Sequence, residues 1–139
     1  MSATENNFCL TEETRQGLKR LSKSLLRLHK TLFDYERTNY ERINGRVRST
    51  GEMFRLVLDN SHFAWLRVLS GQIVLIDEFL AAKQSTFENE GAELFVQTRK
   101  LLLFDDTNED FGDKFQAALQ NSPEAVINYN ESLRFSKGK

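Results

Sequence analysis

The chain has few of the residues that build turns and covalent cross-links. Its 139 residues include one proline, seven glycines and one cysteine. An all-β fold needs turn residues at every chain reversal, so their scarcity argues against that class and favours long helices. The lone Cys9 forms no internal disulfide and supplies no cysteine cluster for a metal ion.

Long hydrophobic runs are also missing. No apolar run approaches the roughly 20 residues that a membrane-spanning helix needs. The longest candidate, residues 63–80, is interrupted by five polar or charged side chains: Arg67, Ser70, Gln72, Asp77 and Glu78. The first residues, MSATENNF, are polar and weakly acidic, unlike the charged-then-apolar pattern of a secretory signal. We therefore expect a cytoplasmic protein in a reducing compartment.

The chain lacks a strong net charge. A formal net charge of −1 excludes a polycation built as a whole for nucleic acid. The charges are nevertheless uneven, because residues 1–48 carry ten Lys/Arg and six Asp/Glu, whereas residues 49–139 carry nine and fourteen. The two parts can complement each other within one chain or across a dimer.

The clearest positive signal is an amphipathic helix pattern from Thr11 to about Ile43. Thr11 is a suitable N-cap, Glu12 and Glu13 suit the first turn, and Asn44-Gly45 suits the end. Apolar residues recur at alternating spacings of three and four, which places them on one stripe of the helix. The stripe consists of Leu18, Leu21, Leu25, Leu28, Leu32 and Tyr35.

Five shorter helices are predicted after this one. We expect them at about residues 51–60, 61–80, 87–104, 109–120 and 123–135. Ser49 with Glu52 has the capping-box spacing, and Ser122 with Pro123 marks the start of the last helix. The last helix offers Val126, Ile127 and Leu133 as its apolar side.

The sequence thus predicts an all-α protein, an antiparallel helical bundle of five or six helices with a long N-terminal amphipathic helix. No linker or long repeat divides the chain, so residues 11–135 are expected to form a single domain. Residues 1–10 and 136–139 are expected to be flexible tails.

Two segments carry a resemblance to known proteins. The first contains Leu28-His29-Lys30, Leu32, Asp34 and Glu36-Arg37, and the second is Phe63-Ala64-Trp65-Leu66-Arg67. Together they resemble a small uncharacterised family of bacterial all-helical proteins that share L-H-K-x-L-x-D-x-E-R and F-A-W-L-R segments. The resemblance covers about residues 25–80 and implies an all-helical bacterial protein, with no activity or site attached to it.

The most specific candidate site is a basic face on the first helix. Between residues 15 and 30 there are six cations and no carboxylate, and the cations lie opposite the leucine stripe. A basic amphipathic helix binds phosphate backbones, anionic lipids or acidic proteins, although an ordinary solvated face has the same pattern. The basic face consists of Arg15, Lys19, Arg20, Lys23, Arg27 and Lys30. Leu26 and Phe33 lie at its edge and are candidates for self-association.

Signals for catalysis, metals and cofactors are weak, so none of these sites is assigned. His29 and His62 both lie outside the Glu-x-x-His pairs of di-iron bundles. The sequence contains neither the Gly-x-Ser-x-Gly motif nor a phosphate-binding P-loop. The charged residues of the second half of the first helix are interpreted as a solvated face. They are Asp34, Glu36, Arg37, Glu41 and Arg42.

Three functions remain open from the sequence. The leading one is a non-enzymatic protein–protein interaction or adaptor module that forms a homodimer and binds an unknown protein partner. The alternative is an anionic partner, nucleic acid or a membrane surface, on the basic face. The third is a bundle that binds a metal or a small ligand.

Overall fold

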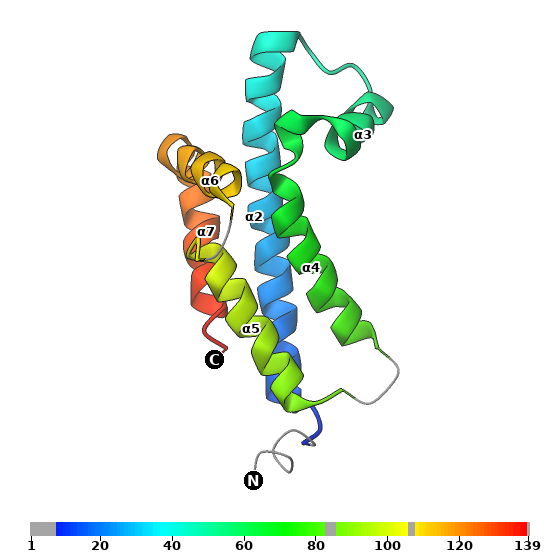
Figure 1. Cartoon of the computed structure of the whole chain (residues 1–139), viewed down its shortest axis with the longest axis vertical. Helices are drawn as coiled ribbons and strands as arrows, with labels where there is room; N and C mark the ends of the chain where they lie inside the picture. Colours follow the sequence, from blue (N-terminus) through cyan, green and yellow to red (C-terminus); the bar gives the residue numbers. More distant parts are fainter. Residues whose placement is uncertain (1–7, 83–85, 106–107, 139) are drawn as a thin grey trace.

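The computed structural model describes residues 8–82, 86–105 and 108–138, and every regular element in these ranges is helical. The elements are α2 (Glu12–Asn44), α3 (Thr50–Asp59), the 3₁₀ helix η1 (Ser61–Phe63), α4 (Leu66–Ala81), α5 (Glu88–Leu102), α6 (Glu109–Asn121) and α7 (Pro123–Phe135). In Figure 1, α2 spans the length of the molecule while α4 and α7 descend on either side of it. The predicted all-α class, with an antiparallel bundle and a long N-terminal helix, is confirmed.

The ends of α2 are fixed by the residues that the sequence suggested. The Thr11 side chain accepts a hydrogen bond from the Thr14 N–H, which satisfies one of the unpaired donors of the first turn. At the other end Gly45 has a φ of 85°, a conformation that glycine adopts without steric cost, and its N–H donates to the Glu41 carbonyl. A helix of 33 residues results, with Glu12 and Glu13 at its positive end.

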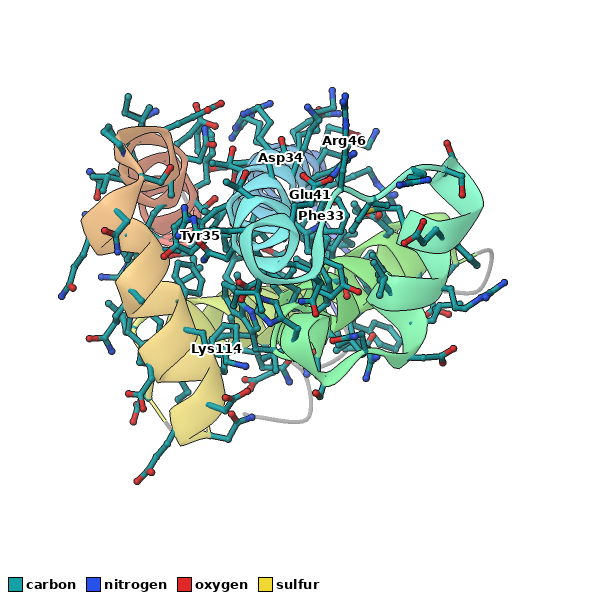
Figure 2. The ribbon with its side chains drawn as sticks, turned by 90° about the horizontal axis from the view of Figure 1, so that it is seen from above. Phe33, Asp34, Tyr35, Glu41, Arg46 and Lys114 are labelled. Carbon is teal, nitrogen blue, oxygen red and sulfur yellow. The ribbon has the colours of Figure 1, made fainter. Side chains whose placement is uncertain are left out.

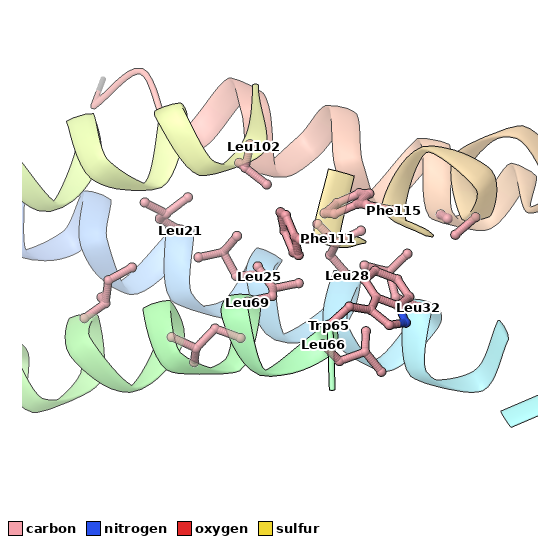
Figure 3. Packing of buried hydrophobic residues seen from close by; sticks show 14 of the residues in the cluster. Leu21, Leu25, Leu28, Leu32, Trp65, Leu66, Leu69, Leu102, Phe111 and Phe115 are labelled. Carbon is pink, nitrogen blue, oxygen red and sulfur yellow. The ribbon is translucent and has the colours of Figure 1, made fainter. Parts of the chain in front are cut away.

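The core is organised around the leucine stripe of α2. Its five leucines have no exposed surface, and side chains from α4, α5, α6 and α7 surround them (Figure 3). The stripe comprises Leu18, Leu21, Leu25, Leu28 and Leu32. Because a buried leucine contributes about 2 kcal/mol, this stripe is the main apolar contribution of α2 to folding.

An aromatic cluster closes one part of the core. Phe115 meets Phe104, Phe111 and Tyr129 with ring planes at 69–82° and centroids 5.2–5.5 Å apart. Phe104 has a φ of 60°, and the N–H groups of Phe104 and Asp105 donate to the carbonyls of Leu101 and Lys100. These bonds form a Schellman end to α5, in which the ring contacts hold a bulky residue where glycine is usual.

The apolar side predicted for α7 is wrong for Val126 and Ile127, which are exposed, whereas Leu133 is partly buried against the core as predicted. Ile127 is 68% exposed, whereas Ala125 and Ser132 are buried. Small side chains face inward because α7 lies close against α2, and close approach leaves no room for branched ones.

The contact between α2 and α7, which we call the α2–α7 seam, is polar. Ser132 donates to Ser24 at 3.1 Å, and the Thr31 hydroxyl donates to Asn128 at 2.6 Å. Arg27 of α2 also pairs with Glu131 of α7. Every buried side-chain nitrogen and oxygen among the described residues has a hydrogen-bond partner, so this polar seam leaves none unsatisfied.

The described residues of the two expected tails form contacts with the rest of the chain. Leu10 N–H donates to the Thr86 carbonyl and Glu88 N–H donates to the Phe8 carbonyl, so residues 8–10 are held by the segment before α5. At the other end Ser136 is 2% exposed and continues the end of α7 by local hydrogen bonds. Residues 1–7 and 139 lie outside the described residues.

A carboxylate at the start of α5 fastens the start of α2. Glu88 Oε1 accepts from the Thr11 N–H at 2.9 Å, and Oε2 accepts from the Thr14 hydroxyl. Burial alone would raise the pKa of Glu88, but the hydrogen bonds from Thr11 and Thr14 outweigh it and hold the pKa below its usual 4.5.

We expect Glu88 to make the fold acid-sensitive. Because its pKa is lower in the folded chain, the carboxylate stabilises the fold above pH 4.5, and this stabilisation is lost as the pH falls through the folded pKa. Urea denaturation between about pH 3 and pH 7 should show that Glu88→Gln loses stability at pH 7 and responds less to acid than wild type. An unchanged slope in the variant would contradict this role. Glu93, on the same helix and exposed, provides the control Glu93→Gln.

Candidate functional site

Three of the six cations of the basic face have a partner within the chain. Arg15 lies at the edge toward α4 and donates to the Leu80 carbonyl at 3.3 Å. Arg27 lies at the edge toward α7, where it pairs with Glu131. Lys30 is 3.9 Å from Asp34, one turn further along the exposed side of α2. Half of the predicted basic face therefore already has partners within the chain.

The remaining three cations are Lys19, Arg20 and Lys23. All three are exposed, and none forms an ion pair with a carboxylate among the described residues. With Arg27 paired to Glu131 and Lys30 to Asp34, these three cations make a smaller and less uniform positive surface than the sequence suggested. Such a surface attracts a phosphate backbone weakly, because each neighbouring carboxylate offsets one cation.

The two candidate self-association residues differ in burial. Leu26 is 59% exposed on α2. Phe33 points toward α3 and α4 in Figure 2 and is half-buried, with its ring centroid 5.7 Å from that of Phe63. Phe33 therefore contributes to the core of its own chain, and Leu26 remains available to a partner.

A buried carboxylate, missed in the sequence, lies at the next position of the leucine stripe. Glu36 is 5% exposed, four residues beyond Leu32. Its Oε1 accepts from Trp65 Nε1 at 2.7 Å, and its Oε2 lies 2.9 Å from His62 Nε2 and 3.4 Å from the Asn39 amide nitrogen. We call Glu36, His62 and Trp65 the Glu36 centre. It joins the middle of α2 to η1 and to the residue before α4.

The interpretation of the charged half of α2 as a solvated face is therefore wrong for Glu36. It also fails for Glu41, whose carboxylate accepts from the Val47 N–H at 2.8 Å and so holds the loop after α2. Asp34 is exposed, and Figure 2 shows it on the outer side of α2. Carboxylates on one helix thus serve as a core acceptor, a loop anchor and a surface charge.

His62 of the Glu36 centre reaches the surface. Its side chain is 30% exposed, and it borders an open cleft of about 590 Å³ whose lining includes Tyr40, Asp110 and Lys114. In enzymes that activate a nucleophile, a carboxylate orients an imidazole, and the imidazole takes a proton from a nucleophile that is hydrogen-bonded to it. Among the described residues His62 Nε2 bonds to Glu36, and no serine or cysteine side chain bonds to the ring. The arrangement connects η1 to α2.

Two of the exposed apolar side chains lie on α3 and two on α4. Phe54 and Leu58 of α3 are 65% and 52% exposed, and Val74 and Leu75 of α4 are 53% and 51% exposed. Arg67 at the start of α4 donates to the Leu58 carbonyl and so holds the end of α3 beside α4. We call residues Arg67, Gly71, Val74, Leu75 and Glu78, which share one side of α4, the α4 outer face. A large exposed apolar patch on a folded chain marks an interaction surface.

Metal and membrane sites find no support in the described ranges. Residues 8–82, 86–105 and 108–138 contain no group of three or more His, Cys, Asp and Glu side chains arranged to hold a metal ion. The same ranges contain no helix with the length and apolar character required to cross a bilayer.

Comparison of the chain with protein-family models, with curated proteins and with solved structures gave no match.

Proposed function

We propose that this protein is a non-enzymatic interaction module that binds protein partners and associates with itself. The observation that carries the proposal is the exposed apolar surface of α3 and α4. Its four side chains, Phe54, Leu58, Val74 and Leu75, are each more than half exposed. Burying these side chains against a partner would stabilise the complex by about 25 cal/mol for each Å² of apolar surface removed from water.

The second candidate is binding of an anionic polymer or a membrane surface by the basic face. Exposure of Lys19, Arg20 and Lys23 favours it. It ranks second because Arg15, Arg27 and Lys30 have partners within the chain, and because the net charge of −1 repels a polyanion at long range.

The experiment that separates the two is a crosslinked pull-down from native cells at low and high salt, with and without nuclease. Wild type is compared with Leu75→Glu, which charges the apolar surface, and with Lys19→Glu/Lys23→Glu, which reverses the basic face. The interaction-module proposal expects a protein partner that survives salt and nuclease and is lost with Leu75→Glu. Both variants alter exposed residues, so they should remain folded.

The opposite pattern would overturn the proposal. Recovery of nucleic acid or lipid that disappears at high salt and in Lys19→Glu/Lys23→Glu would establish the basic face as the functional surface. Recovery of a protein partner equally by all three chains would place the interaction on another surface.

A further inference from the structure

We propose that the α4 outer face binds the same face of a second copy of this chain, with the two α4 helices antiparallel. This inference rests on the proposed self-association and specifies its surface. A symmetric dimer uses one patch twice, so each residue of the patch must be complementary to another residue of the same patch.

The spacing of the α4 outer face meets this requirement. Arg67 precedes Gly71 by four residues, and Glu78 follows Val74 by four residues. An antiparallel copy reverses this order, so that Gly71 faces the partner's Val74 and Arg67 faces the partner's Glu78. The two-fold axis then passes at the level of Gln72 and Ile73, and every pair occurs twice.

Gly71 supplies the space that such a contact needs. No heavy atom of the described chain lies within 4 Å of a Cβ placed on Gly71, so its own fold does not require a glycine there. Glycine in the middle of a helix costs about 1 kcal/mol relative to alanine. In the dimer, Gly71 lets the two helices approach closely, because it has no side chain and the partner's Val74 packs directly against its backbone.

The charges at the ends of the face favour a second copy over another partner. Arg67 uses Nη2 for the carbonyls of Val57 and Leu58, and its other nitrogens have no hydrogen bond among the described residues. Glu78 is exposed, and no ion pair joins it to a described residue. Unlike Glu78, its neighbour Asp77 accepts from the Ser22 hydroxyl at 2.6 Å, which fixes α4 on α2. The face thus ends in one positive and one negative group, neither of which has an oppositely charged partner among the described residues, at matched distances from its centre.

A charge swap tests the arrangement. Sedimentation equilibrium of wild type, Arg67→Glu, Glu78→Arg and the double variant would be measured from about 1 to about 200 µM. We expect a wild-type dimer, a rise of at least about tenfold in the dissociation constant for each single variant, and recovery to within about threefold in the double variant. Recovery is the decisive result, because a fold damaged by Arg67→Glu would not be repaired by Glu78→Arg.

Two further variants complete the test. Gly71→Leu should be monomeric, because its side chain has open space in the monomer but meets the partner's Val74. At low protein concentration its melting temperature should be at least that of wild type, because a mid-helix glycine has been removed. Leu26→Glu, on α2, should leave the dimer unchanged. A dimer that Leu26→Glu disrupts and the α4 variants do not would overturn this inference while leaving the proposed self-association in place. A wild-type monomer throughout the concentration range would overturn both.

Discussion

Glu36→Ala is expected to destabilise the fold by about 3 kcal/mol, because it removes the acceptor of a buried donor. Trp65 is 2% exposed, so its Nε1–H cannot turn to water when the carboxylate is gone. His62 loses the same partner but reaches solvent through its exposed edge, and therefore contributes less to the loss. Urea denaturation followed by tryptophan fluorescence measures the change directly at Trp65, the one tryptophan of the chain.

Variants of the same residue separate the hydrogen bond from the charge. Glu36→Gln keeps an oxygen for Trp65 Nε1, and we expect it to lose about 1 kcal/mol. In Glu36→Leu/Trp65→Phe both the donor and the acceptor are absent, so the double variant should cost clearly less than the sum of Glu36→Leu and Trp65→Phe. Because Trp65→Phe removes the one tryptophan, the unfolding of these variants is followed by circular dichroism. Asp34→Ala, on the exposed side of α2, is the control and should remain within about 0.5 kcal/mol of wild type. Equal losses in Glu36→Ala and Asp34→Ala would refute the role of the Glu36 centre.

Phe115→Ala is expected to cost about 4 kcal/mol, the largest effect that we predict for a single side chain. Phe115 has no exposed surface, and its ring contacts those of Phe104, Phe111 and Tyr129. Removing it opens a cavity among the rings of Phe104, Phe111 and Tyr129, each of which loses its contact with Phe115. Since a domain of this size has a stability of about 5–15 kcal/mol, the variant should populate unfolded chains well below the wild-type melting temperature.

Thermal unfolding followed by circular dichroism checks this result. Phe115→Leu retains most of the volume and should lose about 1.5 kcal/mol. Phe54→Ala removes the same side chain from an exposed position on α3, and at low protein concentration it should have a nearly wild-type melting temperature. A loss in Phe54→Ala as large as that in Phe115→Ala would mean that ring burial does not determine the stability of this bundle.

Most of the fold was predictable because its signals are local. The spacing of Leu18 to Leu32 identifies a buried helix stripe, and capping by Thr11, Ser49 and Ser122 is present as expected. Each of these signals depends on residues within one or two helical turns of one another. Chain reversals between such helices leave few alternatives to a bundle.

The parts that were missed depend on contacts between distant residues. The stripe of α2 continues from Leu32 to Glu36, so spacing alone would have placed Glu36 in the core, but its charge indicated a solvated position. Only the partners Trp65 and His62, from another part of the chain, make that burial stable. Likewise Glu131 is 104 residues from Arg27, so no local pattern predicts that it neutralises part of the basic face.

The polar α2–α7 seam has a consequence for synthesis on the ribosome. The chain emerges from its N-terminal end, so α2 is made first and meets α7 only after α3, α4, α5 and α6 have been made. During that interval the uncovered flank presents Ser24, Arg27 and Thr31, which water solvates as readily as the later partners do. A flank of leucines in the same place would attract other nascent chains. The flank of α2 that waits longest for its partner helix is thus a polar one.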